Sequence, residues 1–208
     1  MTTSTTNPSR YAEPADRTVL EKTAEALRAR GMDARIIEAD LARGMVDELI
    51  PDGVTVYTTT SRTLDELGIS DDVRVSGRYH TTRTHTETLD PATQMREFRR
   101  HVSTMDLVIG SVHAITEDGR VVIASASGSQ LAPYAFGADQ VVWVVGAQKI
   151  VPDLDTAFDR IEKHSLPLES ERLLEVYGMP STIGKELVVH SERPGRITVL
   201  LLDTAIGF

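Results

Sequence analysis

The sequence predicts an α/β fold with a mostly parallel sheet flanked by helices. Two short apolar runs, Leu107–Ile109 and Val141–Val145, are rich in β-branched residues, and a glycine follows each run. Such runs are too short for helices and are typical of strands that are buried on both faces of a parallel sheet. Between them, the polar turn at 128–130 precedes a predicted helix, and ligands of open α/β sheets bind at strand ends of this kind.

The first part of the chain carries regular start and stop signals. Asp16 and Asp40 are candidate N-caps, and Gly31 is a typical helix stop. In chain order we expect a helix over 15–30, a strand over 34–39, a helix from Asp40 to Ile50, a strand over 54–57, a helix through Leu67, and a turn with a short strand over 68–75.

Residues 76–92 are polar and weakly periodic, so we expect either an exposed loop or a lid. His80 and His85 lie five residues apart in this segment. A zinc pair at this spacing needs a third ligand, and the neighbouring Arg78 and Arg83 disfavour a cation. The sequence therefore predicts no metal site.

The second part of the chain adds a hairpin beside the sheet, because Glu117-Asp118-Gly119 predicts a tight turn. We expect a helix over 90–101 with arginines on a solvated face, a strand over 106–110, a return strand over 120–124, a helix through Phe136, a strand over 141–145, a helix from Asp153, a helix over 165–178, and strands over 187–190 and 197–202.

Composition narrows the class of protein. The 208 residues include 40% hydrophobic and 25% charged residues, and the net charge of −9 disfavours nonspecific binding to nucleic acid or to an anionic membrane. The lack of cysteine excludes disulfides, thiolate nucleophiles, iron–sulfur clusters and thiolate zinc sites. No apolar segment approaches the length of a membrane span, and residues 1–14 lack the apolar region of a secretory signal.

From these observations we expect a cytoplasmic protein that needs no cofactor. Residues 1–13 are predicted to form a flexible tail, and residues 14–208 a single domain. A homodimer is the assembly expected from base rates.

The segment TTTSRT (58–63) is the first candidate for ligand binding. Hydroxyl groups and an arginine stand here at a strand-to-helix junction, and backbone N–H groups at a helix start suit a phosphate or carboxylate. The alternative is a well-capped helix without a ligand. The candidate residues are Thr59, Thr60, Ser61, Arg62 and Thr63.

A second group of polar residues follows the return strand. Hydroxyl and amide groups converge there at a strand end in the expected crevice, where they can bind a ligand or cap a helix. The candidates are Ser127, Gly128, Ser129 and Gln130, with Gly119 of the preceding turn.

Three further candidates flank these groups. His113 can act as a general base or orient Glu117, and the alternative is a hydrogen-bonded structural residue. Gln148 and Lys149 follow the strand over 141–145, where Lys149 can neutralise a ligand anion or pair with Glu117.

Five segments of the chain resemble the LUD-domain family, also called lactate utilisation protein C or DUF162. The resemblance covers nearly the whole chain in order. The segments are HAITEDG (113–119), GSQ (128–130), GAQKIVPDLDTAFDRI (146–161), PLESER (167–172) and GRITVLLLDTAIGF (195–208).

The resemblance implies the three-layer α/β sandwich of the superfamily that contains ribose-5-phosphate isomerase, glucosamine-6-phosphate deaminase and CoA transferases. It implies a small anionic ligand, which is an organic acid, a phosphosugar or an acyl-CoA. It also implies an accessory role in organic-acid metabolism of the lactate type, beside redox-protein partners. The alternative is a transferase or isomerase-like enzyme in which Glu117 attacks an acyl group as the nucleophile.

Among the departures of the chain from the family pattern, two bear on how a ligand is bound. Ser129-Gln130 stands where many members carry Asn-Arg, so an anion-pairing arginine is replaced by a neutral amide. The TTTSRT segment lacks the glycines that let backbone approach a phosphate closely. The resemblance therefore implies a distinct subgroup whose ligand can differ.

Overall fold

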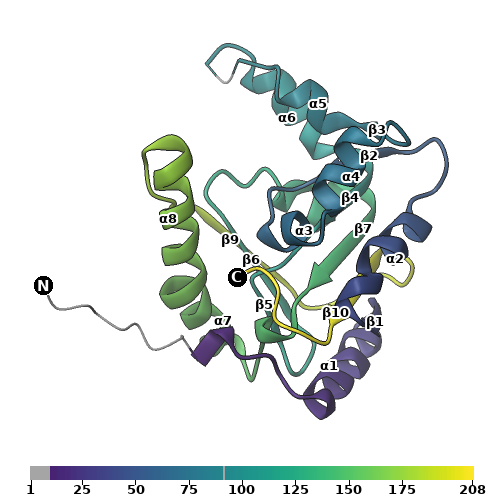
Figure 1. Ribbon diagram of the computed structural model, residues 1–208, viewed down its shortest axis with the longest axis vertical. Coiled ribbons are helices and arrows are strands. Elements are labelled where there is room, and N and C mark those ends of the chain that lie inside the picture. Colours follow the sequence, from purple (N-terminus) through teal and green to yellow (C-terminus); the bar gives the residue numbers. More distant parts are fainter. Residues whose placement is uncertain (1–9, 91) are drawn as a thin grey trace, which may run out of the picture.

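A six-stranded parallel sheet forms the centre of the molecule (Figure 1). The computed structural model describes residues 10–90 and 92–208. In spatial order the strands are β1 (Asp33–Ile37), β10 (Ile197–Leu202), β7 (Ala138–Val145), β4 (Met105–Gly110), β2 (Thr55–Thr58) and β3 (His80–Thr81).

The two apolar runs of the sequence form the middle of this sheet. Strand β7 pairs with β10 on one side and with β4 on the other. Residues Val141–Val145 and Leu107–Ile109 are almost fully buried, because helices or further strands cover both faces of the sheet. This confirms the predicted mostly parallel sheet.

Helices cover one face of the sheet and close one hydrophobic core. They are α2 (Ala42–Leu49), α3 (Arg62–Glu66) and α4 (Ile69–Val75). Their apolar side chains, such as Val46, Leu64 and Val73, pack with Val142 and Val144 of β7.

The opposite face carries α1 (Arg17–Ala29), α6 (Met95–Ser103) and a second, smaller sheet. Leu20 and Leu27 of α1 and Val102 of α6 share a core with Trp143 and Val145. The predicted three-layer arrangement, with the sheet between two covering layers, is therefore confirmed.

The smaller sheet contains the predicted hairpin. Its strand order is β8 (Ile150–Val151), β5 (Ala114–Thr116), β6 (Val121–Ser125) and β9 (Lys185–Val189), and only the β5–β8 pair is parallel. Its inner side joins the core under α1, and its outer side packs on Ala157 and Ile161.

One continuous helical segment connects β8 to the loop before β9. It consists of α7 (Leu154–Arg160), a π-helical turn (Ile161–Ser165) and α8 (Leu166–Tyr177). The sequence predicted two helices here. Pro167 has no N–H to donate, and the wider π turn before it lets the helix continue past this gap. Gly178 ends α8 in the left-handed conformation, with φ of 73°.

Residues 68–92 differ from the prediction. Residues 69–75 form helix α4 rather than a strand, because Gly68 at φ 69° ends α3 and lets Ile69 and Val73 face the core one helical turn apart. The polar segment 76–92 contains strand β3 and the short helix α5 (Thr82–Thr86). Helix α6 begins at Met95, after a turn in which the carboxylate of Asp90 accepts hydrogen bonds from Ala92 N and Thr93 Oγ1.

Three short segments form 3₁₀ turns, which are η1 (Arg10–Ala12), η2 (Ala39–Leu41) and η4 (Ala147–Lys149). The expectation of a flexible tail through residue 13 does not hold for residues 10–12, because Tyr11 is buried and its carbonyl accepts a hydrogen bond from Arg160. Residues 1–9 lie outside the described residues. The helix expected through Phe136 is a short segment that ends in a π-helical turn, Pro133–Gly137.

Candidate functional site

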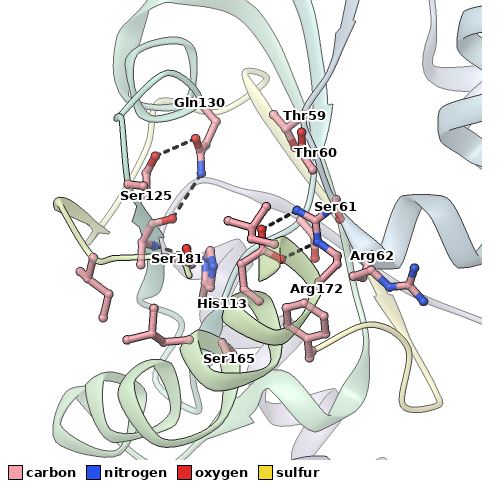
Figure 2. Close-up of a pocket in the computed structure, with 18 of the residues that line it drawn as sticks. Thr59, Thr60, Ser61, Arg62, His113, Ser125, Gln130, Ser165, Arg172 and Ser181 are labelled. Atoms are coloured by element: carbon pink, nitrogen blue, oxygen red, sulfur yellow. Dashed lines mark hydrogen bonds and ion pairs between the residues drawn. The ribbon is translucent and has the colours of Figure 1, made fainter. Parts of the chain in front are cut away.

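A cavity of about 320 Å³ opens at the carboxyl ends of β2 and β4, between the main sheet, the smaller sheet and α8 (Figure 2). This is the edge at which the sequence predicted a ligand site. The cavity brings together nine of the predicted site residues, which are Thr59, Thr60, Ser61, Arg62, His113, Ser127, Ser129, Gln130 and Lys149.

Lys149 is the buried cation of the cavity. Its side chain is 2% exposed, and its ammonium group donates hydrogen bonds to Thr63 Oγ1 at 3.0 Å and Ser111 Oγ at 3.1 Å. Burial, with the nearby charge of Arg160, lowers the pKa of Lys149 to about 7. The charge of Glu66 opposes this shift, but no carboxylate of the described chain lies within ion-pair distance of the ammonium group, so a ligand anion could pair with it.

His113 has a fixed tautomer in the cavity wall. Its Nδ1 accepts a hydrogen bond from the backbone N–H of Ala124 at 3.2 Å, so the ring proton is assigned to Nε2. Burial, with the charges of Lys149 and Arg160, lowers the pKa of His113 to about 3. The ring is therefore neutral near pH 7 and offers its Nε2–H as a donor, while the role of general base stays a prediction.

Arg160 positions several parts of the site although the sequence did not indicate it. The fully buried guanidinium donates to the carbonyl oxygens of His113 at 2.6 Å and Gln148 at 3.3 Å, and to Ser165 Oγ at 2.9 Å. Burial lowers its pKa to about 10. Arg160 lies three residues after the buried Ala157 and therefore on the same face of the helix. This spacing could have indicated from the sequence that Arg160 is buried.

The Gly-Ser-Gln turn is held together by its own hydrogen bonds. Gln130 donates to the carbonyl of Ala124 at 3.2 Å and accepts from Ser125 Oγ at 2.8 Å. Ser125 Oγ in turn accepts from the N–H of Gly128 at 2.8 Å. Gln130 was predicted to bind a ligand or to cap a helix. In the structure its side-chain amide bonds to Ser125 and Ala124 and so holds the cavity wall in shape.

Three charged residues of the cavity lining, Arg62, Glu169 and Arg172, take part in ion pairs. Arg172 donates to both carboxylate oxygens of Glu169, at 2.8 and 2.6 Å, and both side chains are about one quarter exposed. Arg62 pairs with Glu66 at 3.1 Å. Glu169 and Arg172 are three residues apart on α8, and both line the cavity.

Glu117 lies away from the cavity lining. Its carboxylate accepts a hydrogen bond from Lys22 at 2.8 Å, so the partner is Lys22 and not Lys149. His113 and Glu117 stand at opposite ends of β5, and four residues at about 3.3 Å each put them roughly 13 Å apart. The nucleophilic role of Glu117 stays a prediction, without support from this placement.

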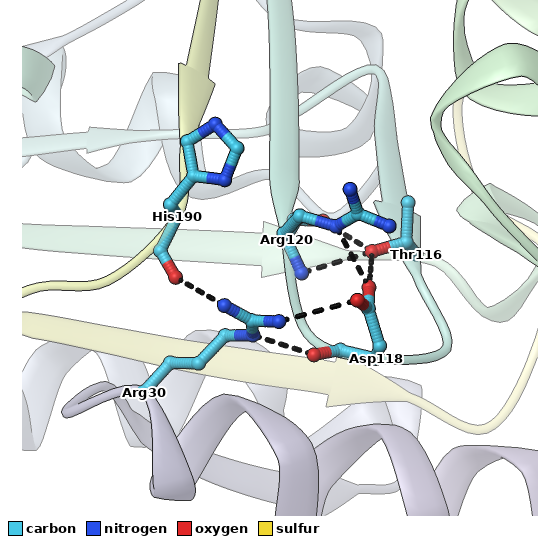
Figure 3. Close-up of polar contacts among 5 residues, drawn as sticks. All are labelled: Arg30, Thr116, Asp118, Arg120 and His190. Atoms are coloured by element: carbon cyan, nitrogen blue, oxygen red, sulfur yellow. Dashed lines mark hydrogen bonds and ion pairs between the residues drawn. The ribbon is translucent and has the colours of Figure 1, made fainter.

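The turn around Glu117 serves the packing of α1 (Figure 3). Asp118 accepts hydrogen bonds from Thr116, Arg120 and Arg30, and Arg30 also donates to the carbonyl of His190. A Cβ atom on Gly119 would lie 2.7 Å from backbone atoms of α1, so only glycine fits.

Three other predicted residues also lie outside the lining. Gln148 donates to the carbonyl oxygens of Ile206 at 2.9 Å and Gly207 at 3.0 Å, so it anchors the C-terminal segment. Thr63 accepts the hydrogen bond from Lys149, and Gly128 packs against the side chain of Lys185. Sequence reasoning missed Ser111, Ser125 and Tyr134, which do line the cavity.

Comparison with known proteins identifies the family of this chain. The sequence model of the LUD domain matches residues 20–202, and the chain therefore belongs to the LUD-domain family, as the resemblance indicated. None of the curated protein sequences matches the chain.

The described fold also has solved counterparts. A DUF162 family protein from Deinococcus radiodurans is similar over 91% of this chain and 99% of its own, with 11% identity and a TM-score of 0.57. Ribose 5-phosphate isomerase A from Neisseria gonorrhoeae is similar over 67% of this chain and 65% of its own, with 12% identity and a TM-score of 0.33. The first likeness bears on the fold alone. Among the described helices, none is both long and apolar enough to cross a membrane.

Proposed function

We propose that this LUD domain binds a small organic acid in the cavity, with a ligand carboxylate beside Lys149. The observation that carries the proposal is the buried ammonium group of Lys149, which donates hydrogen bonds to the hydroxyl groups of Thr63 and Ser111. Because a buried cation without an opposite charge is costly, a ligand anion would relieve that cost.

The other donors favour an acid that carries a hydroxyl or oxo group. The same cavity is lined by His113, Thr60 and Ser61, whose Nε2–H and hydroxyl groups can donate hydrogen bonds to such a group. Arg62 and Arg172 already have carboxylate partners, so they are less available for a second ligand charge. These groups suit a small hydroxy or oxo acid better than a long polyanion.

A role in organic-acid metabolism follows from this proposal and from the LUD family. A cytoplasmic location, redox-protein partners and a homodimer stay predictions from the sequence. The cavity gives no specific reason to prefer a transferase, since the carboxylate once suggested as nucleophile is paired with Lys22.

Thermal unfolding with a panel of ligands tests the proposal. The panel contains 2-hydroxy and 2-oxo acids of two to six carbons, the matching neutral amides, sugar phosphates and CoA thioesters. We expect at least one small acid to raise the Tm in a concentration-dependent way, by mass action, while its amide does not. A panel in which only phosphates or thioesters bind, or in which acid and amide bind equally, would contradict it.

A further inference from the structure

A second group of ligand-type side chains lies on helices α5 and α6, apart from the cavity lining. His85 belongs to α5, while Glu97 and His101 are one helical turn apart on α6. The packing of these two helices brings the three side chains together, although His85 is twelve residues from Glu97 in sequence. Figure 1 shows the two helices side by side at one end of the molecule.

The distances in this group are close to those of a metal site. Glu97 Oε1 lies 3.4 Å from His85 Nε2 and 3.9 Å from His101 Nε2, and the ligand atoms of the three residues all lie within 4.8 Å of one another. Two ligands of a tetrahedral zinc ion, each about 2.0 Å from the metal, are roughly 3.3 Å apart. Small side-chain rotations would therefore suffice to place all three atoms around one ion.

The chemistry of the donors selects the kind of ion. Two imidazole nitrogens and one carboxylate oxygen suit Zn²⁺ and neighbouring transition metals, whereas Ca²⁺ and Mg²⁺ require more oxygen ligands. The side chains of His85, Glu97 and His101 are 50%, 47% and 41% exposed, so an ion can enter from solvent and keep water as a fourth ligand.

We propose that His85, Glu97 and His101 form a binding site for a divalent transition-metal ion of the zinc type, which links α5 to α6. The sequence predicted no metal site, since the His80–His85 pair lacked a third ligand; in the structure His80 is outside the group, and Glu97 and His101 of α6 join His85. The exposed Arg96 and Arg100 flank Glu97 and His101 in sequence, and their charge would lower the affinity without occupying the ligand atoms.

A metal ion bound between α5 and α6 would also affect the cavity, because α5 contacts residues at the cavity edge. Arg83 of the same helix donates to the carbonyl of Thr58 at 2.8 Å and to Thr60 Oγ1 at 3.1 Å, and Thr60 lines the cavity. A metal ion at His85 would therefore hold in place a helix that supports the cavity edge.

Metal titration of tag-free, chelator-treated protein tests this site, with Zn²⁺ and Co²⁺ as probes. We expect Co²⁺ to give visible absorption bands of a low-coordinate nitrogen and oxygen site, Zn²⁺ to displace it, and Zn²⁺ to raise the Tm. Loss of an outer-shell partner alone costs roughly 10- to 100-fold in metal affinity, so His85→Ala and His101→Ala should each weaken binding by at least about tenfold.

Two further variants keep the result interpretable. Glu97→Gln retains the shape of the side chain and should also weaken binding, while His80→Ala removes a histidine of the same segment from outside the group and should bind as the native chain does. All four positions are exposed or partly exposed, and circular dichroism checks that each variant is folded. Equal Zn²⁺ affinity in the native chain and in His85→Ala and His101→Ala, or no Co²⁺ bands at saturation, would overturn the proposal.

Discussion

Lys149 and Arg160 show that single buried cations shape this molecule. Arg160 is satisfied by backbone carbonyls and a serine, so its role is to position the cavity wall. Lys149 has two hydroxyl partners and borders the cavity. An ammonium group in that place costs free energy in the unliganded protein, and the proposed ligand explains why it is there.

Replacing Lys149 by Met should weaken ligand binding without lowering the stability of the ligand-free protein. We expect affinity for the acid identified in the panel to fall about 10- to 100-fold, since a hydrogen bond to a charged group is worth about 1.5–3 kcal/mol. The Tm of the ligand-free variant at pH 6 should equal or exceed that of the native chain, because the charged ammonium no longer has to be buried.

Calorimetric titration and thermal unfolding at pH 6 measure the two effects. Lys185→Met is the control, because Lys185 donates to the carbonyl of Ser127 near the cavity yet does not line it. Undiminished affinity in Lys149→Met would refute the placement of the ligand carboxylate.

Glu117→Gln should leave ligand binding unchanged. The carboxylate pairs with Lys22, whose side chain is 65% exposed, and such pairs are worth at most about 1 kcal/mol. Titration of the same acid measures the affinity, and Lys22→Gln should give the same small change in Tm. A large loss of binding or of any turnover in Glu117→Gln would restore the catalytic role that the resemblance implied.

At the scale of elements, the end of β4 shows why the site needs a glycine. Gly110 stands where β4 passes Tyr134 and Thr59, whose hydroxyl groups lie 3.2 Å apart. A Cβ atom on Gly110 would lie 1.7 Å from Tyr134 Oη and 2.5 Å from Thr59 Oγ1. Tyr134 is itself fixed edge-on against Trp143, with ring centroids 5.4 Å apart, so it cannot move away freely.

Alanine substitutions at two glycines should therefore have opposite signs. We expect Gly110→Ala to destabilise the protein by about 1–3 kcal/mol through overpacking. Gly44→Ala lies in helix α2, where nothing is within 4 Å of the added Cβ, and should stabilise it by about 0.5–1 kcal/mol. Urea unfolding of both variants measures the difference, and equal effects would show that the space around Gly110 can relax.

At the scale of the whole molecule, burial between the layers lowers the pKa of several cations. Burial lowers the pKa of His113 to about 3 and that of His164 to about 4, with smaller contributions from the charges of Lys149 and Arg160. The unfolded chain binds protons at these histidines near pH 6.5, before the folded chain does. Their contribution to stability is therefore present above pH 6.5 and is lost as the pH falls toward 4 and 3.

His113→Asn should make the acid dependence of unfolding shallower. Each histidine can contribute a slope of up to about 1.4 kcal/mol per pH unit below pH 6.5. Asparagine keeps an acceptor for the N–H of Ala124 but does not titrate. The free energy of unfolding by urea at pH 8, 6.5 and 5 measures the slope, and parallel slopes in both proteins would contradict the burial of a neutral ring.

Much of the fold could be predicted because its signals are local. The runs at 107–109 and 141–145 are apolar over their whole length, and burial on both faces produces that pattern in any parallel sheet. Residues 68–75 were misassigned because short apolar spacing fits both a strand and a helix, and packing of Ile69 and Val73 on the sheet decided between them.

The sequence by itself determined the parallel sheet, its flanking helices and the LUD family of this protein. Tertiary structure alone decided which polar residues meet. Neighbours in sequence such as His113 and Glu117 are separated by a strand, while Thr60, Lys149 and Arg172 converge on one cavity from distant segments. The physical reason is that side-chain periodicity is set by near neighbours, whereas the burial and pairing of a charge depend on every element packed around it.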